Sequence, residues 1–144
     1  MKIKFEVFGK PMGKERHRDT WNGRKYTPPK TQTREDEIRW AYKQKYGNYR
    51  FPKGTCLELL VVAVFPIPKS APKYKQKLML SGEIRPDVKP DYDNIAKIVS
   101  DALNKVAYDD DKSIVDSTQR KFYGENPRTI IILQEAKPLE RSQI

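Results

Sequence analysis

The sequence predicts a single α/β domain of the α+β kind, with a mixed β-sheet, two helices and the element order β-α-β-α-β-β. Three patterns carry this prediction. Apolar and polar residues alternate at the N-terminus as in a half-buried strand, apolar residues at 95–106 recur at helical spacing, and residues 59–65 form an apolar run typical of a central strand. A chain of 144 residues is long enough to bury a core. We expect one domain over residues 1–135 and a frayed C-terminal tail over residues 136–144.

The remaining elements follow from the same periodicities and from the residues that interrupt them. The predicted elements are a strand over residues 2–7, a helix over 33–46 that stops at Gly47, a strand over 55–65, the helix with the apolar face at 95–106, and strands over 113–123 and 129–135. A helical turn is expected near residues 74–80. The last two strands are expected to pair as a hairpin, because only Gly-Glu-Asn-Pro at 124–127 separates them.

The composition is that of a basic globular protein. The chain carries 29 Lys and Arg against 19 Asp and Glu, a formal net charge of +10. A field of this sign attracts polyanions, nucleic acid first. The longest apolar run is too short to span a bilayer, so no membrane segment is expected. The single cysteine, Cys56, cannot form an internal disulfide, which favours a cytosolic, reducing compartment.

Two basic segments stand out from the regular elements. Residues 9–30 are rich in Gly, Pro, Lys and Arg with interleaved aromatic residues, and residues 69–89 form a second basic connection. Residues 9–30 can be a solvated loop, or a basic arm that grips phosphates and stacks on exposed bases. We favour the second interpretation for them, because long loops in compact domains tend to be functional. Residues 69–89 are expected to contact phosphates as well. The predicted nucleic-acid-binding residues are Lys14, Arg16, Arg18, Arg24, Lys69, Lys73 and Lys89.

Aspartates flank the helix of residues 95–106. Asp91 and Asp93 lie at its entrance, where Asp93 or Asn94 can cap the first turn, and Lys97 follows one turn later with Asp101 on the same polar face. After the helix come three consecutive aspartates at 109–111. These acids can be caps, a surface ion pair and an acidic turn. Carboxylates that converge repel one another unless a cation lies between them, and Mg²⁺ or Mn²⁺ prefers such oxygen ligands.

Other chemistries fit the sequence poorly. The stretch from Asp91 begins like a calcium loop, but Ala96 stands where that loop needs glycine. There is no phosphate-binding glycine loop and no pair of cysteines for zinc. The one histidine, His17, lies in the first basic segment, so a histidine-based nuclease or a serine triad would depend on it alone.

The sequence resembles the RusA family of Holliday junction resolvases. The motifs that carry the resemblance are Lys89-Pro-Asp91-Tyr-Asp93-Asn94-Ile-Ala-Lys97, Asp101-Ala-Leu103-Asn104 and Tyr108-Asp-Asp110-Asp111-Lys-Ser-Ile-Val115, and it extends to the Gly9–Arg18 and Phe65–Lys69 segments. The resemblance implies a small homodimeric endonuclease that needs Mg²⁺ and places symmetric nicks in four-way DNA junctions.

The resemblance also implies roles for individual residues. Asp91 and Asp93 correspond to the first two metal-binding carboxylates, and Lys97 corresponds to the catalytic lysine. The third carboxylate belongs to a pair of aspartates followed by a strand. Alignment on Ser-Ile-Val at 113–115 makes Asp111 the ligand and catalytic residue, with Asp110 as the alternative. His17 stands where the family commonly has proline, which bears on the conformation of the first basic segment.

The sequence therefore predicts a metal-dependent endonuclease that resolves branched DNA as a two-fold dimer. Two alternatives stay open. One is a nuclease of broader specificity, acting on branched or flap DNA with the same scaffold. The other is a non-catalytic nucleic-acid-binding domain, in which the aspartates only cap helices and form turns.

Overall fold

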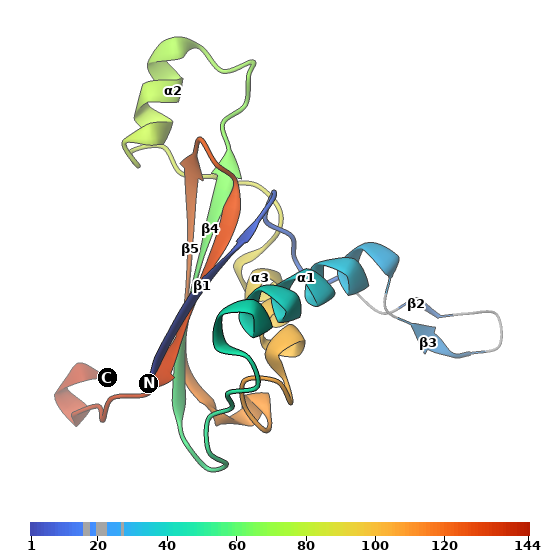
Figure 1. The fold of residues 1–144 in the computed structure, drawn as a ribbon. Helices are drawn as coiled ribbons and strands as arrows, with labels where there is room; N and C mark the ends of the chain where they lie inside the picture. Colours follow the sequence, from blue (N-terminus) through green and yellow to red (C-terminus); the bar gives the residue numbers. More distant parts are fainter. Residues whose placement is uncertain (16–17, 20–22, 27) are drawn as a thin grey trace.

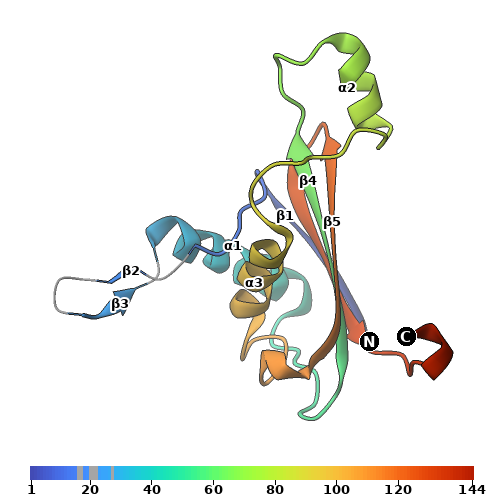
Figure 2. The ribbon, with the colours of Figure 1, turned by 180° about the vertical axis from the view of Figure 1, so that it is seen from behind.

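The computed structural model describes residues 1–15, 18–19, 23–26 and 28–144, and its centre is a four-stranded mixed sheet with two helices against one face (Figures 1 and 2). The strands are β1 (Lys2–Phe8), β4 (Leu57–Pro66), β5 (Ile114–Gly124) and β6 (Arg128–Glu135), in the order β1-β6-β4-β5. The helices are α1 (Pro29–Tyr46), α2 (Lys73–Leu80) and α3 (Tyr92–Leu103). This arrangement confirms the predicted single domain with a mixed sheet.

The predicted hairpin of the last two strands is wrong. Strand β4 lies between them, parallel to β5 and antiparallel to β6, so the connection at 125–127 passes over the end of β4 (Figure 1). Two strand spacings are about 10 Å, and four residue steps reach about 13 Å, so this short connection can span the gap. Gly124 makes the crossing feasible, because a Cβ there would lie 2.5 Å from Cγ1 of Val64.

The core lies between the sheet and the two helices. Alternate residues of β1 point inward and are buried, and those between them face solvent, as the period-two pattern predicts. On α3 the predicted apolar face is buried, and on α1 Ile38 and Tyr42 pack inward. The largest fully buried side chains are Tyr42, Tyr108, Phe51, Phe65, Ile3, Ile38, Leu57, Ile95, Ile98, Leu103, Ile131 and Leu133.

The helices differ from the prediction at their ends and in number. Helix α1 begins at Pro29, four residues before the predicted start, because proline at the first helical position lacks only an N–H that would have no partner there. The helical turn expected near residues 74–80 is a full helix, α2, so the described chain has three α-helices and not two. Helix α3 begins at Tyr92 with Asp91 in the N-cap position, so the predicted capping by Asp93 or Asn94 is wrong.

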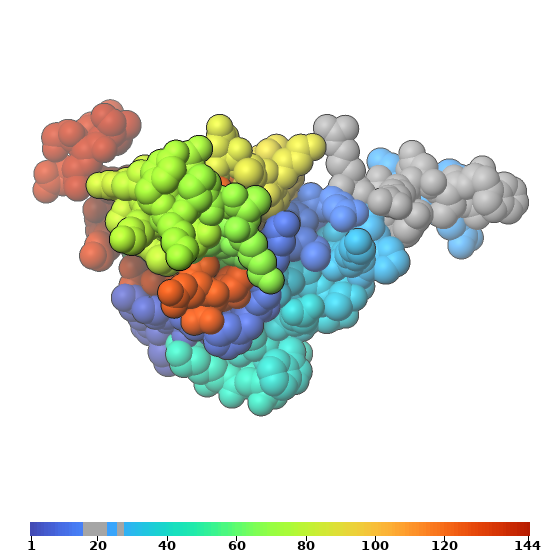
Figure 3. Space-filling model, turned by 90° about the horizontal axis from the view of Figure 1, so that it is seen from above, coloured from blue at the N-terminus to red at the C-terminus, as the bar shows by residue number. Residues whose placement is uncertain are grey.

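Two segments extend from this body. Helix α2 lies beyond the end of the sheet at which β4 finishes, and Figure 3 shows it covering that end of the molecule. The short strands β2 (Arg18–Asp19) and β3 (Lys25–Tyr26) pair with each other and lie well away from the sheet, past the start of α1. At the C-terminus a 3₁₀ turn, η2, spans Arg141–Gln143, and the domain boundary at residue 135 stays a prediction. No helix in the described ranges is long and apolar enough to cross a membrane.

Candidate active site

The N-terminal end of α3 presents two exposed carboxylates. Asp91 occupies the N-cap position, yet its side chain makes no capping hydrogen bond, and Asp93 lies in the first turn. Neither side chain forms an ion pair or a side-chain hydrogen bond with the described part of the chain. They border a hollow of about 520 Å³, between the end of the 81–91 connection and β5, that is also lined by Lys89 and Lys121. Their oxygens are thus available to a ligand from solvent.

The first basic segment packs directly on this end of α3. The backbone N–H of Lys14 donates to the Asn94 carbonyl at 2.9 Å. Gly13 permits this approach, because a Cβ there would lie 2.7 Å from Cβ of Pro90 and 2.9 Å from Cβ of Asn94. The close contact fixes the root of the basic segment beside Asp91, with which it shares a second hollow.

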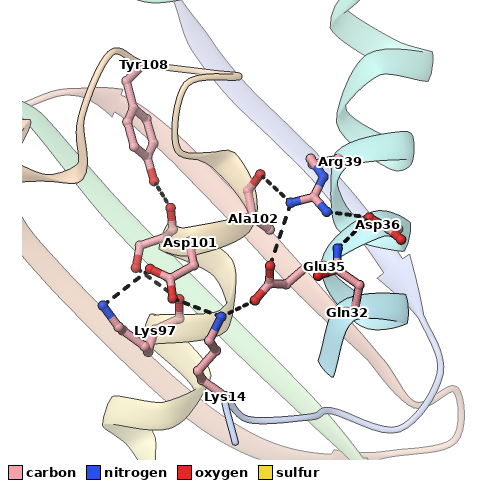
Figure 4. A network of polar contacts seen from close by, with 10 residues as sticks. Lys14, Gln32, Glu35, Asp36, Arg39, Lys97, Asp101, Ala102 and Tyr108 are labelled. Carbon is pink, nitrogen blue, oxygen red and sulfur yellow. Dashed lines mark hydrogen bonds and ion pairs between the residues drawn. The ribbon is translucent and has the colours of Figure 1, made fainter. Parts of the chain in front are cut away.

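A chain of charged groups connects the segment, α1 and the polar face of α3 (Figure 4). The Lys14 ammonium donates to Glu35 and lies 3.2 Å from Oδ2 of Asp101, whose Oδ1 lies 3.3 Å from the Lys97 ammonium. Burial alone would lower the pKa of Lys14, but the hydrogen bonds to Glu35 and Asp101 outweigh it and raise that pKa. On α1, Glu35 also pairs with Arg39 at 3.7 Å. The expected proximity of Lys97 and Asp101 is confirmed.

The carboxylates of Asp110 and Asp111 follow a loop that Tyr108 anchors to α3. Tyr108 is buried, and its hydroxyl donates to the Ser100 carbonyl of α3 at 2.6 Å, with burial raising the pKa of the phenol. The chain then reaches the short 3₁₀ helix η1 (Asp111–Ser113), for which Asp110 is the N-cap and accepts from the Lys112 N–H at 2.9 Å. This anchoring holds Asp110 and Asp111 beside α3.

The two consecutive aspartates sit in different environments. The hydrogen bond from the Lys112 backbone lowers the pKa of Asp110. Partial burial raises the pKa of Asp111, and the Asp110 carboxyl adds to this effect while the positive charge of Lys97 opposes it. Asp111 lines a small hollow of about 190 Å³ with Ala96 and Ser100 of α3. It therefore lies within the electrostatic reach of Lys97, and Asp110 has a local structural partner.

The donor set has the chemistry that Mg²⁺ prefers, since Asp91, Asp93 and Asp111 offer only carboxylate oxygen. In the described ranges no three His, Cys, Asp or Glu side chains come together closely enough to form a ready-made metal cluster. Asp91 and Asp93 share one hollow and Asp111 lines another. These residues therefore fit the ion by the type of ligand that they offer, while their carboxylates do not surround one common hollow.

The predicted nucleic-acid-binding residues have different surroundings. Lys69, Lys73, Lys89 and Arg24 are exposed, whereas the ammonium of Lys14 is held between two carboxylates. Arg16 and His17 lie outside the described residues, and for Arg18 only the backbone of β2 is described.

Sequence reasoning missed two residues near the site. Lys121 projects from the helix-facing side of β5 into the hollow with Asp91 and Asp93, and Glu35 is the buried partner of Lys14. A signal for Lys121 was present in the sequence, because residues 116–121 are polar at every position, so polar side chains must also occupy the face of β5 that the helices cover. For Glu35 there was no local signal, because its partners come from other elements.

Comparisons with known proteins agree with this geometry. A family described as Endodeoxyribonuclease RusA matches residues 9–134, which include the first basic segment, both clusters of aspartates, the whole of β4 and β5 and all of β6 but its last residue. A curated relative from Bacillus subtilis (strain 168), named Uncharacterized protein YqaN, is 32% identical over 136 residues, covering 92% of this chain and 96% of the relative. The similarity thus spans almost the whole of both chains.

Proposed function

The chain belongs to the RusA family of endodeoxyribonucleases, and from this membership we propose that it is a Mg²⁺-dependent enzyme that resolves four-way DNA junctions. It acts as a homodimer, and each subunit nicks one of two opposing strands. A two-fold dimer suits a four-way junction, because one active site per subunit gives paired cuts on strands related by the same symmetry. The biological setting that fits this activity is recombination and repair.

The observation that carries the proposal is the state of Asp91 and Asp93. A carboxylate at an N-cap usually accepts a backbone N–H, and an acid in a protein with this excess of cations usually has a basic neighbour. Asp91 makes no capping bond, and both side chains are exposed. Helix capping, which would be a purely structural role for Asp91, therefore does not explain why an aspartate stands at this position.

The proposed roles follow from these positions. Asp91, Asp93 and Asp111 hold Mg²⁺, or Mn²⁺ in its place. The bound ion supplies a Lewis acid that polarises the phosphodiester and steadies the leaving oxygen. Asp111 is favoured over Asp110 because Asp110 already accepts the Lys112 N–H. Lys97, half-exposed on α3, places positive charge where the phosphate becomes more negative in the transition state.

The basic segments provide the contacts to DNA phosphates. Lys69 and Lys73 precede and open α2, and Lys89 borders the hollow that contains Asp91 and Asp93. The N-terminal end of α3 faces the end of the molecule that carries α2 (Figures 1 and 2). A DNA backbone that runs along these cations passes close to the carboxylates.

The experiment that tests the proposal compares DNA substrates of different shape. The purified protein is incubated with Mg²⁺ and a synthetic four-way junction, a flap or linear duplex, and the nicks are mapped on each strand. Paired nicks in the junction alone support the proposal. Equal cutting of flaps indicates the broader nuclease, and binding of junctions without cutting by the wild-type chain indicates a non-catalytic DNA-binding domain. The Asp93→Asn variant controls for a contaminating nuclease.

A further inference from the structure

We propose that Asp101 is the positioning residue for Lys97, and that Lys14 of the first basic segment holds Asp101 in the required orientation. The inference rests on the proposed function, because it concerns the rate of the reaction in which Lys97 takes part. It also assigns Lys14 a task inside the protein, in place of the phosphate contact that the sequence suggested.

The argument begins with the two oxygens of one carboxylate. Asp101 Oδ1 lies 3.3 Å from the Lys97 ammonium, and Oδ2 lies 3.2 Å from the Lys14 ammonium. Both oxygens face ammonium groups of the protein, which compete with any metal ion for the charge of this carboxylate. Asp101 is therefore assigned to binding the lysines of the site and not the metal ion, although it lies on the helix whose N-terminal end carries Asp91 and Asp93.

The pair between Lys97 and Asp101 would be weak by itself. Such i,i+4 pairs on an exposed helix contribute about 0.3–0.5 kcal/mol and leave both side chains free to change rotamer. Here the side chain of Lys97 is 57% exposed, but that of Asp101 is only 23% exposed. The carboxylate is thus the fixed member of the pair, and what fixes it determines where the ammonium of Lys97 is held.

What fixes the carboxylate is Lys14. Its side chain is 13% exposed, its ammonium also contacts Glu35, and its backbone N–H donates to Asn94 on α3. Glu35 in turn is held by Arg39, which also reaches the Ala102 carbonyl at 3.5 Å (Figure 4). The position of the Lys14 ammonium is therefore fixed by Glu35 and by the anchored backbone of Lys14 itself, and the ammonium orients the plane of the Asp101 carboxylate.

A positioning role differs from a role in stability alone in how two substitutions combine. If Asp101 acts through Lys97, Asp101→Asn lowers the single-turnover cleavage rate of bound junction about ten- to a hundred-fold, and has no further effect once Lys97 is alanine. Affinity for the junction is expected to stay within about two-fold or to tighten, because a negative charge is removed near DNA. The Glu37→Gln variant, which breaks the α1 ion pair with Arg34 at 3.1 Å, is the matched control.

A second readout does not depend on activity. Acylation of lysine amines, followed by mass spectrometry of the peptides, reports how well each ammonium is shielded. Lys14 is expected to react slowly in the parent protein and several-fold faster in Asp101→Asn, with no change in Glu37→Gln. If Asp101→Asn does not fold, Asp101→Glu takes its place, since it keeps the charge but moves the carboxylate by one methylene.

The outcomes separate this inference from the proposed function. A parent protein that cuts no branched DNA overturns the proposed function, and the role of Asp101 in catalysis with it, whatever the labelling of Lys14. A parent that cuts, with Asp101→Asn cutting at the same rate or slowing cleavage equally in the Lys97→Ala background, overturns the positioning role alone. Loss of rate only where Lys97 is present, with faster labelling of Lys14, supports it.

Discussion

The carboxylates at the two ends of α3 differ in whether the described part of the protein neutralises them. Asp101, near the C-terminal end, lies between the ammonium groups of Lys14 and Lys97. Asp91 and Asp93, at the N-terminal end, are exposed, and no ion pair joins either of them to the described part of the protein. A helix of twelve residues and its N-cap thus hold one carboxylate that pairs with the protein's own cations and two that do not pair with the described residues.

The difference teaches where an external cation is needed. A chain with a net charge of +10 has ample lysine and arginine to place beside every acid. Carboxylates that nevertheless lack such a partner, at the end of the molecule with the exposed lysines of residues 69–89, are suited to a divalent ion and the phosphate that it binds. The partial positive charge at the N-terminus of α3 also favours negative groups there.

The largest expected effect on cleavage comes from a substitution at the N-terminal end of α3, where Asp91 and Asp93 lie. Asp93→Asn keeps the size of the side chain but removes a ligand charge, so junction cleavage is expected to fall more than about a thousand-fold, as is typical when a catalytic group is lost. Junction binding should persist, because one repulsion from phosphate is removed. Single-turnover cleavage and a gel-shift titration measure the two quantities, and a chelator added to the parent protein should reproduce the loss of cleavage.

The matched comparison for Asp93 is Asp116→Asn, an acid of β5 on the face of the sheet away from the helices. It should cut at the parental rate. Equal loss in both variants would mean that general loss of negative charge, and not a metal site at α3, explains the effect.

Most of the fold could be predicted because it depends on local patterns. The alternation in β1 and the apolar stripe of α3 each reflect burial of one face, and each is buried as expected. The error in sheet topology has a different origin. A turn of three residues between two strands favours a hairpin, whereas the pairing of the strands shows that β4 lies between them. The close approach of Gly124 to Val64 is a contact between distant residues that no local pattern predicts.

The candidate site likewise has a part that local sequence patterns predict and a part that depends on contacts between distant residues. Asp91, Asp93 and Lys97 are close in sequence, so the helix alone predicts how they are spaced. Lys14 contacts Glu35, which lies 21 positions further along the chain, and Asp101, which lies 87 positions further along. No periodicity in the sequence predicts contacts over such separations. Lys14 looked like one more cation of a basic segment, because charge is visible in a sequence and a partner across the fold is not.

The next largest effect is expected at Lys97, which lies on α3 between Asp93 and its partner Asp101. Lys97→Ala should lower the single-turnover rate about a hundred- to a thousand-fold with little change in affinity, because its charge acts chiefly in the transition state. Lys97→Arg should restore only part of the rate, since a guanidinium cannot take the place of a compact ammonium. A folded Lys97→Ala protein that cuts at the parental rate would return Lys97 to a surface ion pair.

The pair of consecutive aspartates sharpens the comparison, because the two residues are neighbours and only one of them is expected to hold the metal ion. Asp111→Asn should stop cleavage, whereas Asp110→Asn should cost about ten-fold or less, through a weaker cap on η1. Cleavage rates of the two variants, measured together with their melting temperatures, decide between them. The reverse order would make Asp110 the ligand, and parental rates in both would place the third carboxylate elsewhere.

Substitutions among the paired charges of Lys14, Glu35 and Asp101 should change the stability of the protein more than its affinity for DNA. Lys14→Met leaves Glu35, whose side chain is 9% exposed, with only the more distant Arg39 as a partner, so the free energy of unfolding is expected to fall by roughly 2–4 kcal/mol. The double variant Lys14→Met with Glu35→Met should recover much of this loss, because no buried charge is left uncompensated. Denaturant unfolding measures both, and a change below about 0.5 kcal/mol in the single variant would mean that water screens the pair.

The smallest effect concerns the cations that surround the N-terminal end of α3. Lys69→Ala with Lys73→Ala is expected to weaken junction binding several-fold and to reduce the slope of log affinity against log salt by about 1–2, because fewer counterions are released from DNA. Lys2→Ala with Lys4→Ala removes the same charge from exposed positions of β1 on the opposite face of the sheet from the helices, and is the matched control. If both pairs change the slope equally, DNA responds to the net charge of the whole protein. If only the first pair does, the phosphates follow the path from α2 to α3, and the carboxylates of Asp91 and Asp93 lie where that path brings the backbone of the junction.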